Sequence, residues 1–541
     1  SDKTGTITQN KMTIREIYFD NKLYSKNFLN EDNILYDIMI LNNDVYDNKN
    51  EYIGDPTEIA LLDFTKKYID VEKHQERHKR VDELPFDSDR KIMSTINKFG
   101  NEYKILSKGS FDSIIDHCSK VLENGEIVKL TETKKRKLKN VEMMESNKSY
   151  RVLAFAYKMI EKRYILDNDL ENDLIFVGMT SMIDPPREDV KESIMMCKNA
   201  NIKPIMITGD SLKTACAIAK EIGILENEEE AILGPDLDDL TEEELKEEVK
   251  KYTVYARVSP THKLAIINAW KNNNKVVAMT GDGVNDAPAL KQANIGLGMG
   301  ITGTEVSKNV SDVILSDDSF STIVAAVKEG RRIFDNIRNV LVFLLTGNIA
   351  EVFVVFLAMI FGLEVFVPIQ LLYINLITDS LPAIALAFEK EDDNVMKRKA
   401  RKNDGTFFTP FLISKISLSA LFKTICISSI YFISLNYYNN EVASTMAFLT
   451  IVMTELVFSF TCRNLKKNII NKNLFNNKYL NISMLILIFI QIIIFVTPIK
   501  VLFNICDISL YQALICIVSV MVMFYMDEIT KKILVKIFKD E

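Results

Sequence analysis

Six long apolar segments fill the second part of the chain, and they constrain its fold more than any other feature. A helix that crosses a bilayer needs about 20 mostly apolar residues. One such segment can be the core helix of a soluble protein, but six in succession predict a transmembrane α-helical bundle in a lipid bilayer. The candidate spans are 339–361, 365–388, 416–435, 442–461, 480–496 and 510–525.

Lysine and arginine residues predict how this bundle lies in the membrane, because basic residues gather on the cytoplasmic side. The loop after the second span has six of them between 390 and 402, and the loop after the fourth has five between 463 and 478. The loops between the first and second spans, and between the third and fourth, have none. We therefore expect the first 335 residues and the C-terminus to be cytoplasmic.

The first part of the chain has the composition of a soluble protein. With 541 residues in all, several domains are expected. The net charge of −7 and the pI near 5.5 give no reason to expect a nucleic-acid partner. The seven cysteines form no CxxC pair, which argues against a zinc ribbon or a disulfide framework.

Polar side chains inside the spans are a second signal, because such groups are costly in hydrocarbon and usually face a bundle interior. Their spacing within the first and second spans places each set on one helix face. All carry oxygen donors, as Ca²⁺ requires with its 6–8 oxygen ligands. Hydrogen bonding between helices is the alternative. The set is Asn348 and Glu351 in the first span, Asn375, Thr378 and Asp379 in the second, and Glu455 in the fourth.

Two further residues in the spans have a separate interpretation. Pro382 follows the polar set of the second span and is expected to free backbone carbonyls by interrupting the helical hydrogen bonds. Lys423 in the third span is interpreted as a lysine near a helix end whose ammonium extends toward the cytoplasmic face.

Three segments of the soluble part are apolar strands that lead into polar turns. They are "IMITGDSLKTA" (205–215), "VVAMTGDGVNDAPAL" (276–290) and the opening "DKTGT", which reads as a loop whose strand would precede Ser1. Helical sequence follows the first two. The alternation predicts an α/β domain with a doubly wound parallel sheet and with its chemistry at the carboxyl ends of the strands.

The turns of these segments carry groups suited to phosphoryl transfer. A carboxylate can attack a phosphoryl group, provided that Mg²⁺ and cationic or amide groups offset the charge on the phosphoryl oxygens. Asp2 is the candidate nucleophile, Asp282 the candidate metal ligand, and Lys263 the fixed positive charge. The candidate catalytic set is Asp2, Lys3, Thr208, Gly209, Asp210, Lys263, Asp282, Asn285 and Asp286.

The combination of DKTGT, TGD, Lys263 in "YARVSPTHKLAII" and TGDGVNDAP resembles the P-type ATPases. These are ion pumps with a haloacid-dehalogenase-like phosphorylation domain, and the resemblance covers essentially the whole chain. It implies that ATP phosphorylates Asp2 and that Thr4 and Asp282 join Asp2 around Mg²⁺. Related phosphatases have a second aspartate where this chain has Thr4, so the phosphoenzyme should persist here.

The resemblance also implies a nucleotide-binding domain inserted after the opening segment. Its landmarks are "GDPTE", "LPFDSDRKIMS", "SKGSFD" and "RVLAFAYK", and "MIDPPRED" (182–189) resembles the hinge that returns to the phosphorylation domain. Phe86 and Lys108 would contact the adenine of ATP. The implied cofactor-binding set is Thr4, Glu58, Phe86, Lys91, Lys108, Gly109, Arg151 and Arg257.

The expected domains follow from these segments. Residues 1–10 and 184–335 would form the phosphorylation domain, 11–183 the α+β nucleotide-binding domain, and 336–541 the membrane domain with six helices. In the family, an actuator domain and four further spans precede the phosphorylated aspartate. We therefore expect the chain to be the C-terminal part of a pump whose N-terminal part is missing from this sequence.

The transported ion is predicted from two segments of the spans. "GNIAEV" (347–352) and "NLITDSLPAIALAFE" (375–389) resemble the calcium-transporting branch, and the presence of both Glu351 and Glu455 implies two Ca²⁺ sites. A pump for Mn²⁺, H⁺ or Na⁺ remains an alternative. So do a membrane-anchored dehalogenase-like phosphohydrolase and an inactive nucleotide-binding remnant.

Overall fold

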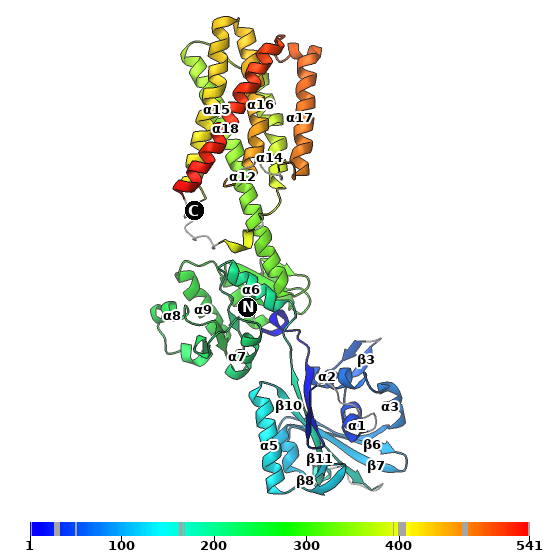
Figure 1. The fold of residues 1–541 in the computed structure, drawn as a ribbon. Helices are drawn as coiled ribbons and strands as arrows, with labels where there is room; N and C mark the ends of the chain where they lie inside the picture. Colours follow the sequence, from blue (N-terminus) through cyan, green and yellow to red (C-terminus); the bar gives the residue numbers. More distant parts are fainter. Residues whose placement is uncertain are drawn as a thin grey trace. The chain divides into compact units, whose positions relative to one another are not determined.

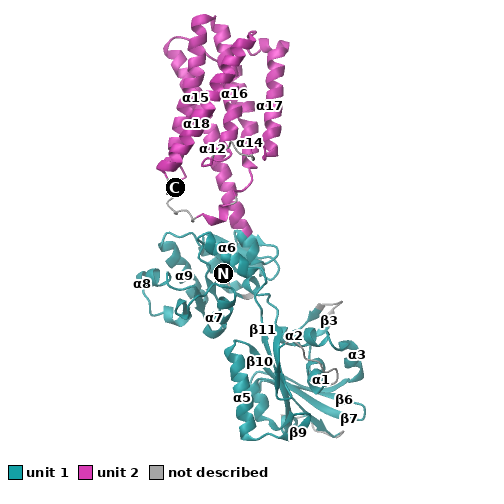
Figure 2. Ribbon diagram, viewed as in Figure 1, with its two compact units in different colours: residues 1–324 teal, residues 325–541 magenta. Residues whose placement is uncertain are grey.

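The computed structural model describes residues 1, 3–25, 33–48, 51–161, 166, 168–392, 394–398, 407–467 and 474–538. Asp2, the candidate nucleophile, lies outside the described residues, as do the side chain of Thr4 and parts of the two basic loops, 399–406 and 468–473. The chain divides into two compact units, residues 1–324 and 325–541, which are described separately (Figure 2).

A nine-stranded sheet is the largest element of the first unit. Its strands are β1 (Thr13–Phe19), β2 (Lys22–Tyr24), β5 (Arg80–Asp87), β6 (Ile92–Phe99), β7 (Glu102–Gly109), β8 (Cys118–Glu123), β9 (Glu126–Lys129), β10 (Arg151–Ile160) and β11 (Leu174–Ile183). Their order is β2-β1-β11-β10-β7-β6-β5, and β8 pairs with both β11 and β9. A separate hairpin joins β3 (Tyr46–Asn48) and β4 (Glu51–Ile53).

Helices cover both faces of this sheet, because successive side chains of a strand point to opposite sides. On β10, Phe155 packs in one apolar cluster with α1 (Ile34–Leu41) and α2 (Pro56–Thr65). Ala154 and Ala156 pack in the other, with α4 (Phe111–Asp116) and α5 (Glu132–Asn147). Figure 1 shows α5 across the sheet from α1 and from α3 (Val71–Arg77).

The predicted parallel sheet is confirmed, in two three-stranded parts. One contains β12 (Met206–Ile207), β14 (Val254–Ala256) and β13 (Ala231–Leu233), and the other β15 (Ala278–Gly281), β16 (Ile295–Met299) and β17 (Val313–Leu315). The surrounding helices are α6 (Val190–Asn199), α7 (Leu212–Glu221), α8 (Glu242–Glu248), α9 (Pro260–Asn272), α10 (Ala287–Gln292) and α11 (Glu305–Val310).

Ser1 connects the two parts of the parallel sheet. Its amino nitrogen donates to the Ile205 carbonyl at 2.8 Å, and its own carbonyl accepts from the Ile207 amide at 2.9 Å. Its hydroxyl lies 2.8 Å from the hydroxyl of Thr280 on β15. Ser1 therefore lies between the β12 segment and β15 and contacts both.

The opening segment is not the loop that the sequence predicts. Lys3–Ile7 forms one π-helical turn, closed by a 3.1 Å hydrogen bond from the Thr8 amide to the Lys3 carbonyl. Gly5 has φ of +74°, which a residue without Cβ adopts at little cost. This conformational freedom at Gly5 allows the backbone to form the five-residue π-helical turn.

The "MIDPPRED" segment runs beside the residues that follow this turn. The Gln9 amide donates to the Pro185 carbonyl at 3.1 Å, and the Arg187 amide donates to the Ile7 carbonyl at 3.0 Å. Asp184 accepts from the Thr8 hydroxyl at 2.5 Å and from the Lys11 amide at 3.1 Å. The two connections between the parallel sheet and the nine-stranded sheet are thus tied together, while their role as a hinge remains a prediction.

The second unit contains the six predicted spans, since six of its helices are long and apolar enough to cross a membrane (Figure 1). The second span has a π-helical segment, Ile374–Thr378, between α13 (Pro368–Tyr373) and α14 (Ser380–Ala387). This irregular segment ends at Thr378, whose carbonyl has no N–H partner at Pro382. The others are α12 (Phe320–Ile360), α15 (Pro410–Tyr437), α16 (Asn440–Cys462), α17 (Lys478–Val496) and α18 (Leu510–Ile537).

Buried ion pairs and a hydrogen bond from one of them connect helices of the bundle. Lys415 of α15 pairs with Asp527 of α18 at 2.6 Å, and the Ser419 hydroxyl donates to the same carboxylate at 2.5 Å. Lys531 pairs with Glu528 at 2.6 Å and donates to the Thr461 carbonyl of α16 at 3.0 Å. Each charge is compensated inside the protein, as burial in a bilayer requires.

We expect Lys415→Met to lower the free energy of unfolding by about 3–5 kcal/mol, because Asp527 is left as an unpaired buried carboxylate. The double variant Lys415→Met/Asp527→Leu should recover most of this loss, since neither charge remains. Thermal unfolding of the detergent-solubilised protein measures both. Equal stability of the single variant and the wild type would show that the Lys415–Asp527 pair contributes nothing to the free energy of unfolding.

Candidate functional site

The opening turn and the two TGD turns meet at one edge of the parallel sheet. The Lys3 ammonium lies 2.7 Å from the Asp210 carboxylate in the turn after β12. The Asp282 carboxylate, in the turn after β15, lies 3.7 Å from where a Cβ on Gly5 would be. The carboxyl ends of parallel strands share one edge, so residues from three distant segments converge there.

The turn after β12 has a fixed backbone. The Thr208 amide donates to the Tyr255 carbonyl at 2.9 Å, and the Thr208 carbonyl accepts from the Val258 amide at 3.1 Å. The Thr208 hydroxyl accepts from the Asp210 amide at 3.1 Å. Gly209 at the tip is exposed, and nothing lies within 4 Å of where its Cβ would be. This loop therefore has room for a group to approach its backbone closely.

Arg257 also lies beside this turn. Its amide donates to the Asp210 carbonyl at 3.0 Å, and its φ is +50°. The sequence places Arg257 in the cofactor-binding set, and its backbone position connects it to the edge where the candidate catalytic residues meet.

Lys263 is held in place by Asp286. Its ammonium lies 2.6 Å from one carboxylate oxygen of Asp286, and both side chains are buried. The other oxygen of Asp286 accepts from the Gly283 amide at 3.2 Å. A Cβ on Gly281 would lie 2.4 Å from the Cβ of Asp286, so only glycine fits at this close approach. The result is a fixed positive charge beside the turn after β15.

Asp282 is anchored at this edge through its backbone. Its carbonyl accepts from the Thr304 amide at 2.8 Å and from the Ser307 hydroxyl at 3.0 Å. The neighbouring Asn285 is exposed.

Thr302 and Asp318 belong to this edge, and the sequence analysis missed both. The Thr302 hydroxyl lies 3.2 Å from where a Cβ on Gly5 would be, and it donates to Asp318 at 2.8 Å. Asp318 also accepts three backbone amides, from Gly300, Ile301 and Thr302. Burial alone would raise the pKa of Asp318, but these hydrogen bonds hold it below its ordinary value. Neither residue lies in a motif that could have indicated this role.

Part of the predicted nucleotide set meets on the nine-stranded sheet. Lys108 of β7 forms an ion pair with Glu58 of α2 and donates to the Asn42 carbonyl. Burial lowers the pKa of Lys108, and Glu58 opposes this shift. A Cβ on Gly109 would lie 2.4 Å from the Lys91 carbonyl, so the β6–β7 pair needs glycine at this position.

Two further residues of that set, Phe86 and Arg151, are solvent-accessible. Phe86 near the end of β5 is 63% exposed, although its ring is large and apolar. Arg151 begins β10 and is also exposed. An exposed aromatic ring on the sheet that carries Lys108 is available to stack on a planar ligand.

In the membrane unit, the structure brings the polar residues of the first two spans together. The Asn375 amide nitrogen lies 3.1 and 3.0 Å from the two oxygens of Glu351. Asp379 is buried, and its Oδ1 has no hydrogen-bond partner among the described residues. Asn348 and Asn375 are exposed. Within the described part of the chain, no group of three or more Asp, Glu, His or Cys side chains is close enough to hold one metal ion.

The interpretation of Lys423 as a lysine that reaches toward the cytoplasmic face is wrong. Lys423 lies well inside the 28-residue helix α15 and is fully buried. Its ammonium lies 2.8 Å from both carboxylate oxygens of Glu455 on α16. Because its charge is compensated inside the bundle, the side chain has no need to extend to water.

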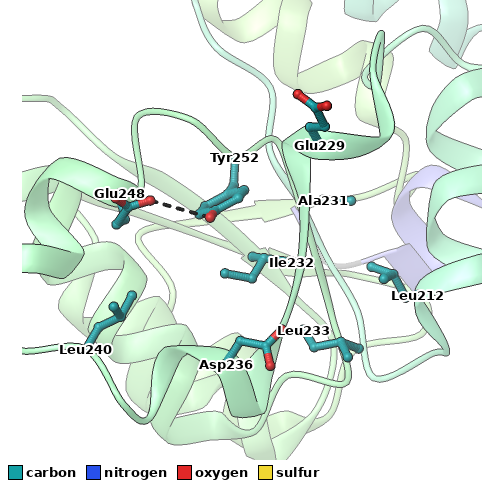
Figure 3. Close-up of a pocket in the computed structure, with 9 residues that line it drawn as sticks. All are labelled: Leu212, Glu229, Ala231, Ile232, Leu233, Asp236, Leu240, Glu248 and Tyr252. Carbon is teal, nitrogen blue, oxygen red and sulfur yellow. Dashed lines mark hydrogen bonds between the residues drawn. The ribbon is translucent and has the colours of Figure 1, made fainter.

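A surface pocket of about 430 Å³ lies along β13 (Figure 3). Its lining includes Ile232, Asp236 and Tyr252, and the Tyr252 hydroxyl donates to Glu248 at 3.4 Å. None of the predicted site residues lines it.

Comparison with known protein families gives two matches. A family model described as the cytoplasmic domain N of P-type ATPases matches residues 27–189. A second, described as the C-terminus of cation transporting ATPases, matches residues 363–533. The first match falls on the nine-stranded sheet and the second on the membrane helices.

Similar curated proteins are named as cation-transporting ATPases. Calcium-transporting ATPase 1 of Bacillus cereus is 43% identical over 520 residues, which cover 92% of this chain and 59% of that protein. Calcium-transporting ATPase 1 of Lactococcus lactis is 42% identical over 491 residues (88% and 55%). The human potassium-transporting ATPase alpha chain 2 is 36% identical over 464 residues (74% and 45%).

The chain spans between half and two thirds of the length of the calcium-transporting relatives that it matches. Its six membrane helices and the match to the C-terminal family model make it a multi-pass integral membrane protein. From the two family models and these relatives, we conclude that the chain belongs to the P-type ATPase family.

Proposed function

We propose that this chain provides the phosphorylation site, the nucleotide site and six membrane helices of an ATP-driven Ca²⁺ pump. The observation that carries the proposal is the convergence of the opening turn, the TGD turn and the TGDGVND turn at one sheet edge. The pump's remaining spans and actuator domain would lie in residues outside this chain, in keeping with the 59% coverage of the Bacillus cereus relative.

In the proposed reaction, a carboxylate oxygen of Asp2 attacks the γ-phosphorus of ATP. The new O–P bond forms as the bond to the bridging oxygen breaks and ADP leaves. Lys263 and the amides after Thr208 would stabilise the negative charge on the transferred group. Lys3 would be positioned by its ion pair with Asp210.

The residues at this edge fit Mg²⁺, which prefers oxygen ligands. The Asp282 carboxylate and the Thr302 hydroxyl both lie near Gly5, and both offer oxygen. Asp282 would hold the metal together with Asp2 and Thr4. When bound, Mg²⁺ would offset negative charge on the phosphate oxygens.

ATP would bind on the nine-stranded sheet through the set that contains Glu58, Phe86, Lys108 and Arg151. The Glu58–Lys108 pair supports this proposal, because it fixes a buried cation on β7 of the sheet whose strand β5 carries the exposed Phe86 ring. Lys91 and Gly109 would shape the backbone beside it.

Phe86→Ala should weaken ATP binding about tenfold or more, because aromatic stacking on a base contributes about 1–3 kcal/mol. Phe86→Tyr keeps a stacking surface and should bind within about threefold of the wild type. Titration with a fluorescent ATP analogue measures both affinities. Unchanged affinity in Phe86→Ala would exclude the ring from the adenine site.

Ca²⁺ is the proposed cargo because the bacterial relatives are named calcium-transporting and because the membrane residues offer oxygen donors. The ligands would come from Asn348, Glu351, Asn375, Thr378 and Asp379. The buried Oδ1 of Asp379, without a partner among the described residues, supports this assignment. The soluble unit and the C-terminus would be cytoplasmic, following the basic loops.

The test uses the complete pump in membrane vesicles, with γ-labelled ATP and Mg²⁺. Acid-stable, hydroxylamine-sensitive label that appears only with micromolar Ca²⁺ is the expected result. If the label forms equally with and without Ca²⁺, the aspartyl phosphate is supported but the transported cation is not Ca²⁺. Absence of label in the folded protein would contradict the proposal, and rapid hydrolysis of simple phosphate esters would favour a phosphohydrolase.

A further inference from the structure

The contact between Lys423 and Glu455 bears on how many cations the membrane unit can hold. Glu455 is buried in α16, and both of its carboxylate oxygens lie 2.8 Å from the Lys423 ammonium. The resemblance to calcium-transporting pumps instead implies that Glu351 and Glu455 together complete two Ca²⁺ sites. A carboxylate with both oxygens on an ammonium is already neutralised.

Two buried aromatic rings lie beside the Lys423 ammonium. The Lys423 Nζ lies 4.0 Å from the ring centroid of Phe458 and 6.0 Å from that of Phe343. Aromatic faces attract a cation at such distances, and more strongly when water is excluded. Both rings are buried and stack on each other.

Glu455 is confined on its other side by the backbone of α12. A Cβ on Gly347 would lie 2.9 Å from Oε1 of Glu455, so the carboxylate packs directly against this glycine. The carboxylate is therefore fixed between Gly347 of α12 and Lys423 of α15.

The charges around Asp379 in the described membrane helices favour a single divalent cation beside them. Asp379 interacts electrostatically with Glu351, Glu455 and Lys423. Within this described set, three ionised carboxylates and one ammonium sum to −2, the charge that one Ca²⁺ neutralises. A second Ca²⁺ beside the same four residues would give the set a charge of +2, and uncompensated charge inside a bundle is strongly unfavourable.

The other buried charges of the described membrane helices do not change this sum. Lys415 pairs with Asp527, and Lys531 pairs with Glu528. Each pair is neutral by itself.

We propose that the Lys423 ammonium takes the place of a second transported cation at Glu455, so that the pump binds one Ca²⁺ per phosphorylation site. The ion is held by the carboxylates of Glu351 and Asp379. Rotation of the Asn375 amide, whose nitrogen faces Glu351, turns its oxygen toward the ion. This inference rests on the proposed function as a Ca²⁺ pump.

The experiment measures equilibrium binding of ⁴⁵Ca²⁺ to the complete pump, with the number of phosphorylation sites determined on the same preparation. For the wild type, the expected ratio of bound Ca²⁺ to phosphorylation sites is one. A ratio of two would overturn the inference while leaving the Ca²⁺ pump intact. Absence of both bound ⁴⁵Ca²⁺ and Ca²⁺-dependent label would instead overturn the proposed function on which the inference rests.

A double variant, Lys423→Met/Glu455→Gln, provides the second readout, because it removes both charges and leaves neither buried alone. It should keep the ratio of one and lose less than tenfold in Ca²⁺ affinity. A loss of tenfold or more would make Glu455 a Ca²⁺ ligand and overturn the inference. Asp379→Asn is the matched control and should lose about a hundredfold or more, since the charge of the ligand set determines Ca²⁺ affinity over several orders of magnitude. If the double variant does not fold, the ratio of bound Ca²⁺ to phosphorylation sites in the wild type tests the inference by itself.

Discussion

Asp2→Asn is expected to abolish phosphorylation by ATP altogether, with at least a thousandfold loss of acid-stable label. A carboxylate oxygen can form an acyl phosphate, whereas a neutral amide is a poor nucleophile and cannot give this product. Labelling with γ-labelled ATP in the presence of Mg²⁺ and Ca²⁺ measures the loss.

The affinity of this variant for ATP should stay within about threefold of the wild type. The proposed nucleotide site is built from the Glu58–Lys108 pair and from strands of the nine-stranded sheet, none of which contains Asp2. Asp239→Asn makes the same chemical change at an exposed carboxylate outside the candidate site and should label normally. Undiminished label on Asp2→Asn would remove Asp2 from its role.

The parts of the fold that the sequence predicted are those with a local signal. Six spans follow from runs of apolar residues, and all six are present as helices. The strands before the two TGD turns follow from short apolar runs that end in polar turns, and these became β12 and β15. In each case the information lies within about 20 neighbouring residues.

The features that the sequence did not predict depend on residues that are far apart in the chain. Lys423 and Glu455 are 32 positions apart on different helices, and their contact depends on how those helices rotate and pack. Asp318 reaches Thr302 across 16 positions through a cluster of amides. Hydropathy and spacing carry no information on such tertiary contacts, so from the sequence alone an isolated lysine in a span is expected to extend toward the cytoplasmic face.

The ion pair between Lys423 and Glu455 also changes how the polar residues of the spans are interpreted. Composition alone makes Glu351, Asp379 and Glu455 equivalent, because each is a carboxylate in a span. The structure distinguishes them by partner: an amide nitrogen for Glu351, no hydrogen bond for Oδ1 of Asp379 among the described residues, and an ammonium for Glu455. A carboxylate that is already paired has a different role from one that is not.

Lys263→Met should slow phosphoenzyme formation by about 10²–10³-fold, because it removes a preorganised positive charge from the site of phosphoryl transfer. The ammonium is fixed 2.6 Å from Asp286, so it needs little reorganisation during the reaction. Rapid-quench measurement of label at saturating ATP gives the rate.

The same change leaves Asp286 buried without its cation, which should also lower the free energy of unfolding by about 3–5 kcal/mol. The double variant Lys263→Met/Asp286→Asn separates the two effects, since it removes the unpaired carboxylate without restoring a positive charge. Its thermal stability should return toward that of the wild type, while its phosphorylation rate stays at least a hundredfold low. If the rate recovers along with the stability, Lys263 is a structural partner of Asp286 and does not stabilise the transferred phosphoryl group.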